Sequence, residues 1–175
     1  GKAYGYQLGI KHKYKEGEFD QVDRVLYDLK NNPASRRILT NIYNFQDLHE
    51  MHLYPCAYSM TFNVSGNKLN AILNQRSQDV LAANNWNVVQ YSILVHMMAQ
   101  VSGLIAGELV HVIADAHIYD KHIPIIEELI EMEEHEPPIL EIDKGVNNFY
   151  NFTVDSFKIN NYKYNPFKVK VPIAV

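Results

Sequence analysis

Cysteine is almost absent from this sequence, because Cys56 is the only one among 175 residues. A single cysteine excludes an intramolecular disulfide. It also fits a protein kept in a reducing compartment, so we expect a cytoplasmic location. No apolar run reaches the roughly 18–20 residues needed to cross a bilayer, so we expect no membrane partner.

Excess positive charge is absent too. The formal net charge is −4 at pH 7, which argues against a protein that binds nucleic acid through bulk positive charge. We therefore expect no nucleic-acid partner, whereas a small anionic substrate needs only a few local arginines. Glycine-rich phosphate loops, HExxH and GxSxG are also missing, so none of these three signatures indicates a function.

Metal ligands of the usual kind are lacking as well. His111, His117 and His122 lie close together in the sequence, but their spacing matches no common zinc pattern. The only thiol, Cys56, is far away along the chain. The sequence therefore predicts no metal site.

What is present predicts one α+β domain over residues 1–175. Helical spacing of apolar residues predicts helices at 19–29, 87–104 and 123–133, and alternating or β-branched runs predict strands at 36–44, 58–64, 68–75, 108–114, just after 138, 158–162 and 169–171. The elements do not alternate as βαβ units, so we expect a mixed β-sheet packed against the helix at 87–104. That helix is apolar nearly all round, which predicts that it is buried in the centre.

The first candidate for chemistry is Cys56, which follows Pro55 at the entry to a predicted strand. A lone cysteine is more often an inert buried side chain than a nucleophile. A free thiol has a pKa near 8.5, so a nearby cation is needed to favour the thiolate. Arg76, at the end of the neighbouring antiparallel strand, could supply that charge and also hold an anion; the alternative is a surface arginine.

Two further pairs complete the candidate set. Arg36 and Arg37 are adjacent, so on a strand they point to opposite faces and do not easily grip one phosphate; alone they read as solvated charge. His117 and Tyr119 share a face of an extended segment and suit a sugar hydroxyl, although two side chains satisfied within the fold are equally compatible. Together, these groups suggest covalent chemistry on a nucleotide monophosphate.

At these residues the chain resembles the thymidylate synthase family. The matching pieces occur in the family's order and at close to its spacing, and they cover essentially the whole chain: Ser35-Arg36-Arg37, Pro55-Cys56, Gln75-Arg76-Ser77-x-Asp79, Trp86-Asn87-x-x-x-Tyr91, Asp115-x-His117-x-Tyr119-x-x-His122 and Pro172-Ile173-Ala174-Val175. The resemblance implies reductive methylation of dUMP to dTMP with 5,10-methylenetetrahydrofolate as co-substrate, giving dihydrofolate without a metal. It also implies a homodimer.

The resemblance further implies a role for each matching position. Cys56 is the nucleophile that attacks C6 of the pyrimidine, and Tyr4 assists removal of the C5 proton. The substrate is bound by Gln75, by Arg76 and Ser77 at its phosphate, by Asn87 at the uracil edge, by His117 and Tyr119 at the ribose 3′-hydroxyl, and by Arg36 and Arg37 from the other subunit. The folate is bound by Asp79 and Trp86, and by the tail residues Ala174 and Val175, which close over the ligands.

The family carries a long N-terminal segment before the position of Gly1, with a further phosphate arginine and part of the folate pocket. We therefore interpret the sequence as the C-terminal catalytic portion of such an enzyme, and expect little turnover without that segment. Two alternatives stay open: a pyrimidine hydroxymethylase of the same fold, which on cytosine is expected to carry an acid in place of Asn87, and a catalytically incomplete nucleotide-binding fragment.

Overall fold

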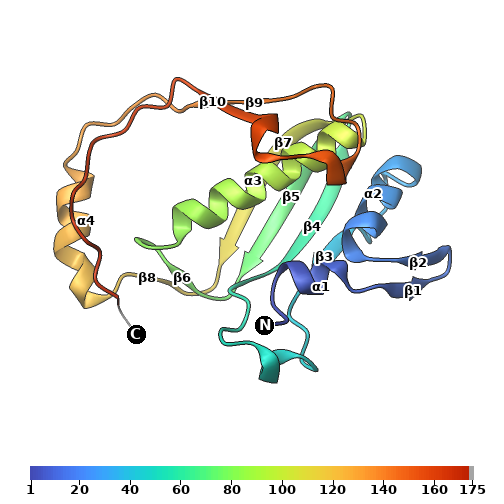
Figure 1. The fold of residues 1–175 in the computed structure, drawn as a ribbon, viewed down its shortest axis with the longest axis horizontal. Helices are drawn as coiled ribbons and strands as arrows, with labels where there is room; N and C mark the ends of the chain where they lie inside the picture. Colours follow the sequence, from blue (N-terminus) through green and yellow to red (C-terminus); the bar gives the residue numbers. More distant parts are fainter. Residues whose placement is uncertain (174–175) are drawn as a thin grey trace.

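The centre of the protein is a four-stranded mixed sheet (Figure 1). The computed structural model describes residues 1–173. The strands lie in the order β3 (Leu39–Asn41), β4 (Ala57–Ser65), β5 (Lys68–Gln75) and β7 (Ile105–Ile113). β3, β4 and β5 are antiparallel neighbours, whereas β5 and β7 are parallel. The expected α+β class with a mixed sheet is confirmed.

The β4–β5 hairpin forms where the sequence predicts it. Ser65 pairs with Lys68 across a turn in which Gly66 adopts φ +62°, a conformation that glycine adopts at little cost. The register then continues along both strands and shifts once between Ala57 and Ser59. This pairing brings the start of β4 next to the end of β5, which is where Cys56 and Arg76 lie.

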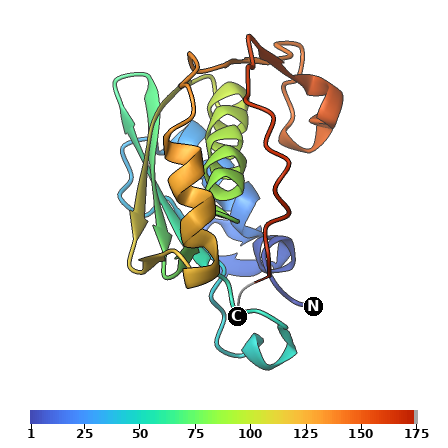
Figure 2. The same cartoon turned by 90° about the vertical axis from the view of Figure 1, so that its left-hand side faces the viewer.

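Helix α3 (Asn84–Val101) connects β5 to the parallel strand β7 and covers one face of the sheet (Figure 2). It ends at Val101, two residues before Gly103, which has φ +71°, and the Leu104 N–H donates to the Ala99 carbonyl at 2.8 Å. The prediction that this helix is buried all round is wrong in part. Its first turns leave Trp86 and Val89 exposed, because no described element covers that side.

The hydrophobic core lies between α3, α2 (Gln21–Asn31) and the inner face of the sheet. Asp20 starts α2 by accepting a hydrogen bond from the Asp23 N–H at 2.8 Å. The core side chains come from both helices and from alternate positions of β4 and β5, and include Val25, Leu29, Met60, Phe62, Leu69, Leu73, Val95 and Met98. This alternation leaves every second residue of the strands on the other face of the sheet.

The N-terminal segment contains two elements that the sequence pattern did not predict. These are the short helix α1 (Gly5–Gly9) and the hairpin of β1 (His12–Tyr14) and β2 (Gly17–Phe19). The hairpin packs on α2 through Arg24, whose guanidinium lies 4.6 Å from the ring of Tyr14 and binds the carboxylates of Glu16 and Asp28.

The remaining elements are short. They comprise β6 (Gln78–Asp79) paired in parallel with β8 (Ala116–His117), α4 (Ile123–Ile130), β9 (Ile139–Ile142) paired with β10 (Phe157–Asn160), and 3₁₀ turns at Leu48–Glu50, Asp120–His122, Phe149–Asn151 and Val154–Ser156. Figure 1 shows α4 far from the central sheet. No helix in residues 1–173 is long and apolar enough to cross a membrane.

Two strand predictions need correction. The strand expected at 36–44 is limited to β3, and beyond the last bond to β4, from the Ile42 N–H to the Tyr58 carbonyl, the Tyr43 N–H donates to the Asn41 side chain at 3.0 Å. The strand expected at 169–171 does not form. A strand exists only when another strand pairs with it, and none of the described strands lies alongside that segment.

Candidate active site

Cys56 lies at the entry to β4, held between the N-terminal segment and the end of β5. Its N–H donates to the Tyr4 hydroxyl at 3.2 Å, and its carbonyl accepts from the Arg76 N–H at 2.9 Å. Pro55, directly before it, is buried, whereas the thiol itself is half-buried and reachable. The cysteine is therefore fixed through its backbone while its sulfur stays open to a ligand.

The Arg76 side chain reaches the same segment, as the hairpin register predicts. Its Nε donates to the Pro55 carbonyl at 3.0 Å, and its Nη2 donates to the Tyr54 carbonyl at 3.0 Å. A guanidinium has five N–H donors, so these two bonds orient the group and leave donors for an anion. Arg76 also lines a cavity of about 340 Å³ together with Tyr43, Phe45 and Tyr58.

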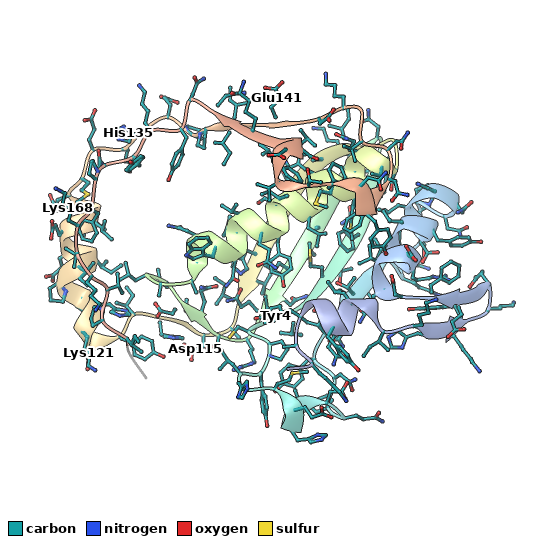
Figure 3. The ribbon with its side chains drawn as sticks, in the orientation of Figure 1. Tyr4, Asp115, Lys121, His135, Glu141 and Lys168 are labelled. Atoms are coloured by element: carbon teal, nitrogen blue, oxygen red, sulfur yellow. The ribbon has the colours of Figure 1, made fainter. Side chains whose placement is uncertain are left out.

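Tyr4 approaches Cys56 from the start of α1, in a backbone conformation with φ +44° that is unusual for a non-glycine residue (Figure 3). Burial is the main cause that raises the pKa of its phenol, and the hydrogen bond from the Cys56 N–H offsets part of this rise. Burial also raises the pKa of the adjacent Tyr91 to about 12. Tyr4 therefore acts at neutral pH as a protonated hydroxyl that can accept and donate hydrogen bonds.

β6 and β8 bring the second group of predicted residues to the same end of the sheet. Asp79 pairs with His117 in this short parallel ladder, and the Gln78 N–H donates to the Asp115 carbonyl at 2.8 Å. The rings of His117 and Tyr119 meet edge to face, with centroids 5.1 Å apart, so the expected shared face is confirmed.

Asp79 offers an acceptor at this edge. Its Oδ1 accepts the N–H groups of Leu81 and Ala82 at 3.1 and 3.0 Å, and no hydrogen bond to its Oδ2 occurs within residues 1–173. Trp86, seven residues later, is 78% exposed and presents a flat aromatic face. The predicted tail residues Ala174 and Val175 lie outside the described part of the chain.

Arg36 and Arg37 are not brought to Cys56. Because Leu39 pairs with Thr61 and Asn41 with Ser59, the chain before β3 runs toward the Gly66 end of the hairpin, away from the start of β4. Both arginines are exposed. From that position they do not act together with Cys56 of the same chain.

Three residues at the site carried no role in the sequence analysis. Gln78 is 1% exposed and binds Asn87, His111 binds Gln75, and His122 contacts the C-terminal segment through its Nε2, 2.9 Å from the Pro172 carbonyl. The buried His122 Nδ1 has no hydrogen-bond partner within residues 1–173 and lies 3.8 Å from Asp79 Oδ1. Only His122 had a signal, its place in the DxHxYxxH motif.

No cluster of three or more histidine, cysteine, aspartate or glutamate side chains in residues 1–173 is arranged to hold a metal ion. What the geometry assembles is a reachable thiol with an arginine, a neutral tyrosine hydroxyl and an amide-rich edge around it. That combination is suited to nucleophilic attack on a ring whose anionic group is bound nearby.

The comparisons with known proteins agree with this arrangement. The sequence model of the thymidylate synthase family matches residues 1–175. A thymidylate synthase of Bacillus phage phi3T is 46% identical over all of this chain, and thymidylate synthase 1 of Bacillus subtilis strain 168 is 44% identical over the same extent. The chain spans 63% of the length of both relatives.

A solved structure, the thermostable thymidylate synthase A from Bacillus subtilis, superposes with a TM-score of 0.93 at 41% sequence identity. The match covers 98% of this chain and 62% of that one. The chain belongs to the thymidylate synthase family.

Proposed function

We propose that this chain carries the catalytic cysteine of a thymidylate synthase, which converts dUMP to dTMP with 5,10-methylenetetrahydrofolate. The observation that carries the proposal is the convergence of Tyr4, Cys56 and Arg76, held by hydrogen bonds of 2.9–3.2 Å between residues that lie 20–52 positions apart in the sequence. Residues 1–175 act as one domain. The free thiol suits a cytoplasmic location, and neither a membrane nor a nucleic acid is required.

The chemistry begins at C6 of the uracil ring. The Cys56 sulfur adds there as the thiolate, which turns C5 into an enolate carbon that can form a bond to a one-carbon unit. Loss of the C5 proton then allows the bond from Cys56 to C6 to break and restores the thiolate. Tyr4, a neutral hydroxyl beside Cys56, assists the proton transfer by hydrogen bonding rather than as a phenolate.

The residues assigned to the substrate position the nucleotide so that its ring lies beside the Cys56 thiol. Arg76 and Ser77 bind the phosphate beside Cys56, while His117 and Tyr119 bind the ribose 3′-hydroxyl. Gln75 supports the site, and Asn87 binds the edge of the ring. Binding energy from the phosphate is thereby used to orient the ring for attack.

Asp79 and Trp86 fit a reduced folate. The Asp79 carboxylate accepts hydrogen bonds from ring N–H groups, and the exposed indole of Trp86 offers a surface for stacking. Ala174 and Val175 would close over both ligands. When bound, the folate supplies the one-carbon unit and the hydride, so the proposed reaction requires no metal or nicotinamide.

We propose a homodimer in which Arg36 and Arg37 reach the phosphate bound by the partner subunit. Their position away from Cys56 of the same chain supports this arrangement. The uncovered face of the sheet supports it as well. There, Leu39, Thr61, Ile72 and Val110 form a continuous row across β3, β4, β5 and β7.

The test is the mass of the intact protein after incubation with 5-fluoro-dUMP and methylenetetrahydrofolate. Fluorine at C5 cannot leave as a proton does, so a covalent adduct of protein, nucleotide and folate should accumulate. The adduct should be absent from Cys56→Ser. Retained 5-fluoro-dUMP binding without an adduct would contradict the proposed turnover and favour a nucleotide-binding fragment.

A further inference from the structure

The role of Asn87 leaves one question about selectivity. A carboxamide carries a donor at one end and an acceptor at the other. Turned one way, it matches a uracil edge, with an N3–H and a 4-carbonyl; turned the other way, it matches a cytosine edge. Asn87 alone therefore does not choose between dUMP and dCMP.

Gln78 lies directly behind Asn87 and is buried. Its Oε1 accepts from the Asn87 Nδ2 at 3.0 Å, and also from the Gln75 Nε2. Its own Nε2 donates to the Asp79 backbone carbonyl at 2.9 Å. Gln78 thus uses both ends of its amide within the protein.

The orientation of each amide follows from the backbone. A carbonyl oxygen only accepts, so the Asp79 carbonyl requires the NH₂ end of Gln78 and leaves Oε1 facing Asn87. The Ser77 carbonyl, 2.8 Å from Gln75 Nε2, fixes Gln75 in the same way. The Gln75 Oε1 then faces His111 Nε2 at 2.9 Å, which must be the donor.

We infer that Gln78 is a positioning residue that fixes the Asn87 amide and thereby makes the site selective for a ring with N3–H beside a 4-carbonyl. The inference rests on the proposed function, which places Asn87 at the ring edge. One Nδ2–H of Asn87 is bound to Gln78, so the other Nδ2–H and the Oδ1 of Asn87 remain to bind the ring. Turning the Asn87 amide to suit cytosine would place its Oδ1 against Gln78 Oε1. Two acceptors in contact repel each other, so a cytosine ring binds more weakly than a uracil ring.

The experiment compares dUMP and dCMP binding by isothermal titration calorimetry, with the wild-type chain and Gln78→Met. Methionine has a similar length but no oxygen to hold Asn87. The ratio of the two dissociation constants should shift toward dCMP by about tenfold, the scale of one hydrogen bond. In an Asn87→Ala background, adding Gln78→Met should leave the ratio unchanged, because the coupling acts through Asn87.

Gln100→Met is the matched control, since Gln100 lies at the far end of α3 and also donates to two backbone carbonyls, those of Asp143 and Val146. It should keep the wild-type ratio. If Gln78→Met lacks a cooperative thermal transition, Gln78→Ala, whose space water can fill, takes its place. An unchanged ratio in the folded variant overturns the inference alone, whereas a wild-type chain that binds no dUMP overturns the proposed function and the inference together.

Discussion

The two faces of the central sheet carry similar apolar side chains but meet different surroundings. On the face under α3, Leu69 and Leu73 are completely buried. On the other face, Val110 and Val112 are 48% and 47% exposed. A contiguous apolar patch on a sheet indicates a surface that another molecule covers. One face of the sheet therefore stabilises the fold of the chain, while the other is exposed and is the face that we propose for the dimer interface.

Neighbouring positions on β5 test this difference most strongly. Leu73 faces the core and Ile72 faces outward, so the substitutions Leu73→Ala and Ile72→Ala remove comparable side chains from opposite faces. Leu73→Ala should lower the free energy of unfolding by about 2–5 kcal/mol, because it leaves a cavity. Ile72→Ala should cost the dilute chain about 1 kcal/mol or less. Urea unfolding monitored by circular dichroism measures both, and equal losses would contradict the assigned faces.

A charge on the open face should disrupt assembly. In a twofold dimer, Val110→Glu brings two carboxylates onto one apolar interface, which should weaken association by about 100-fold or more. Analytical ultracentrifugation measures the dimerisation constant. Val154→Glu, at a position 89% exposed outside the sheet, is the control and should associate as the wild type does. Normal association of Val110→Glu would place the interface elsewhere.

The hydrogen bond between Tyr4 and Cys56 lies at the end of the sheet, away from the open face. Removing it should affect the rate of dTMP formation more than the binding of dUMP. Tyr4→Phe removes the acceptor of the Cys56 N–H and leaves a part-buried donor unpaired, at a cost of about 1–3 kcal/mol. We expect kcat for dTMP formation to fall at least about tenfold while the dissociation constant of dUMP changes little. Tyr6→Phe, two residues later in the first turn of α1 and half exposed, should have no effect on either. A loss confined to dUMP affinity would argue against the assigned role.

The smallest expected effect concerns the network that anchors α1. A hydrogen bond from Gln7, followed by one from Lys2, holds the pKa of Asp47 below its ordinary value. A lowered folded-state pKa means that the stabilisation is present above the ordinary carboxyl range and is lost as pH falls through the folded value.

Between pH 5 and pH 3, the midpoint of thermal unfolding should therefore drop more for the wild type than for Asp47→Asn, by about 2 °C. Asp155→Asn is the control, because the Asp155 side chain is exposed and makes no hydrogen bond within residues 1–173. Identical pH profiles for the wild type and Asp47→Asn would show that Asp47 contributes nothing to this dependence.

The sequence predicted those elements that short stretches of the chain specify by themselves. The β4–β5 hairpin has a glycine turn and two alternating strands, and α3 has a long apolar helical pattern. The hairpin register alone was enough to place Arg76 beside Cys56. The β1–β2 hairpin was missed because each strand is only three residues long and no alternating apolar pattern marks it, and because Arg24 on α2 holds it in place. The strand expected at 169–171 failed because pairing depends on a distant partner.

The same distinction applies to the site. Cys56, Arg76, His117 and Tyr119 could be selected by residue type and spacing. Gln78 could not, since a glutamine in sequence carries no sign of which way its amide will face. That direction depends on the carbonyl of Asp79 and on Asn87, which come together only in the folded chain.

The solitary, half-buried thiol of Cys56 has a practical consequence for quantitative work. A reagent specific for thiols attaches to one atom of the chain, so the moles incorporated count the chains with a reactive Cys56. A reporter placed there would lie beside Tyr4 and Arg76 in every molecule. If the proposed function holds, protection of this thiol by added nucleotide measures the occupancy of the site.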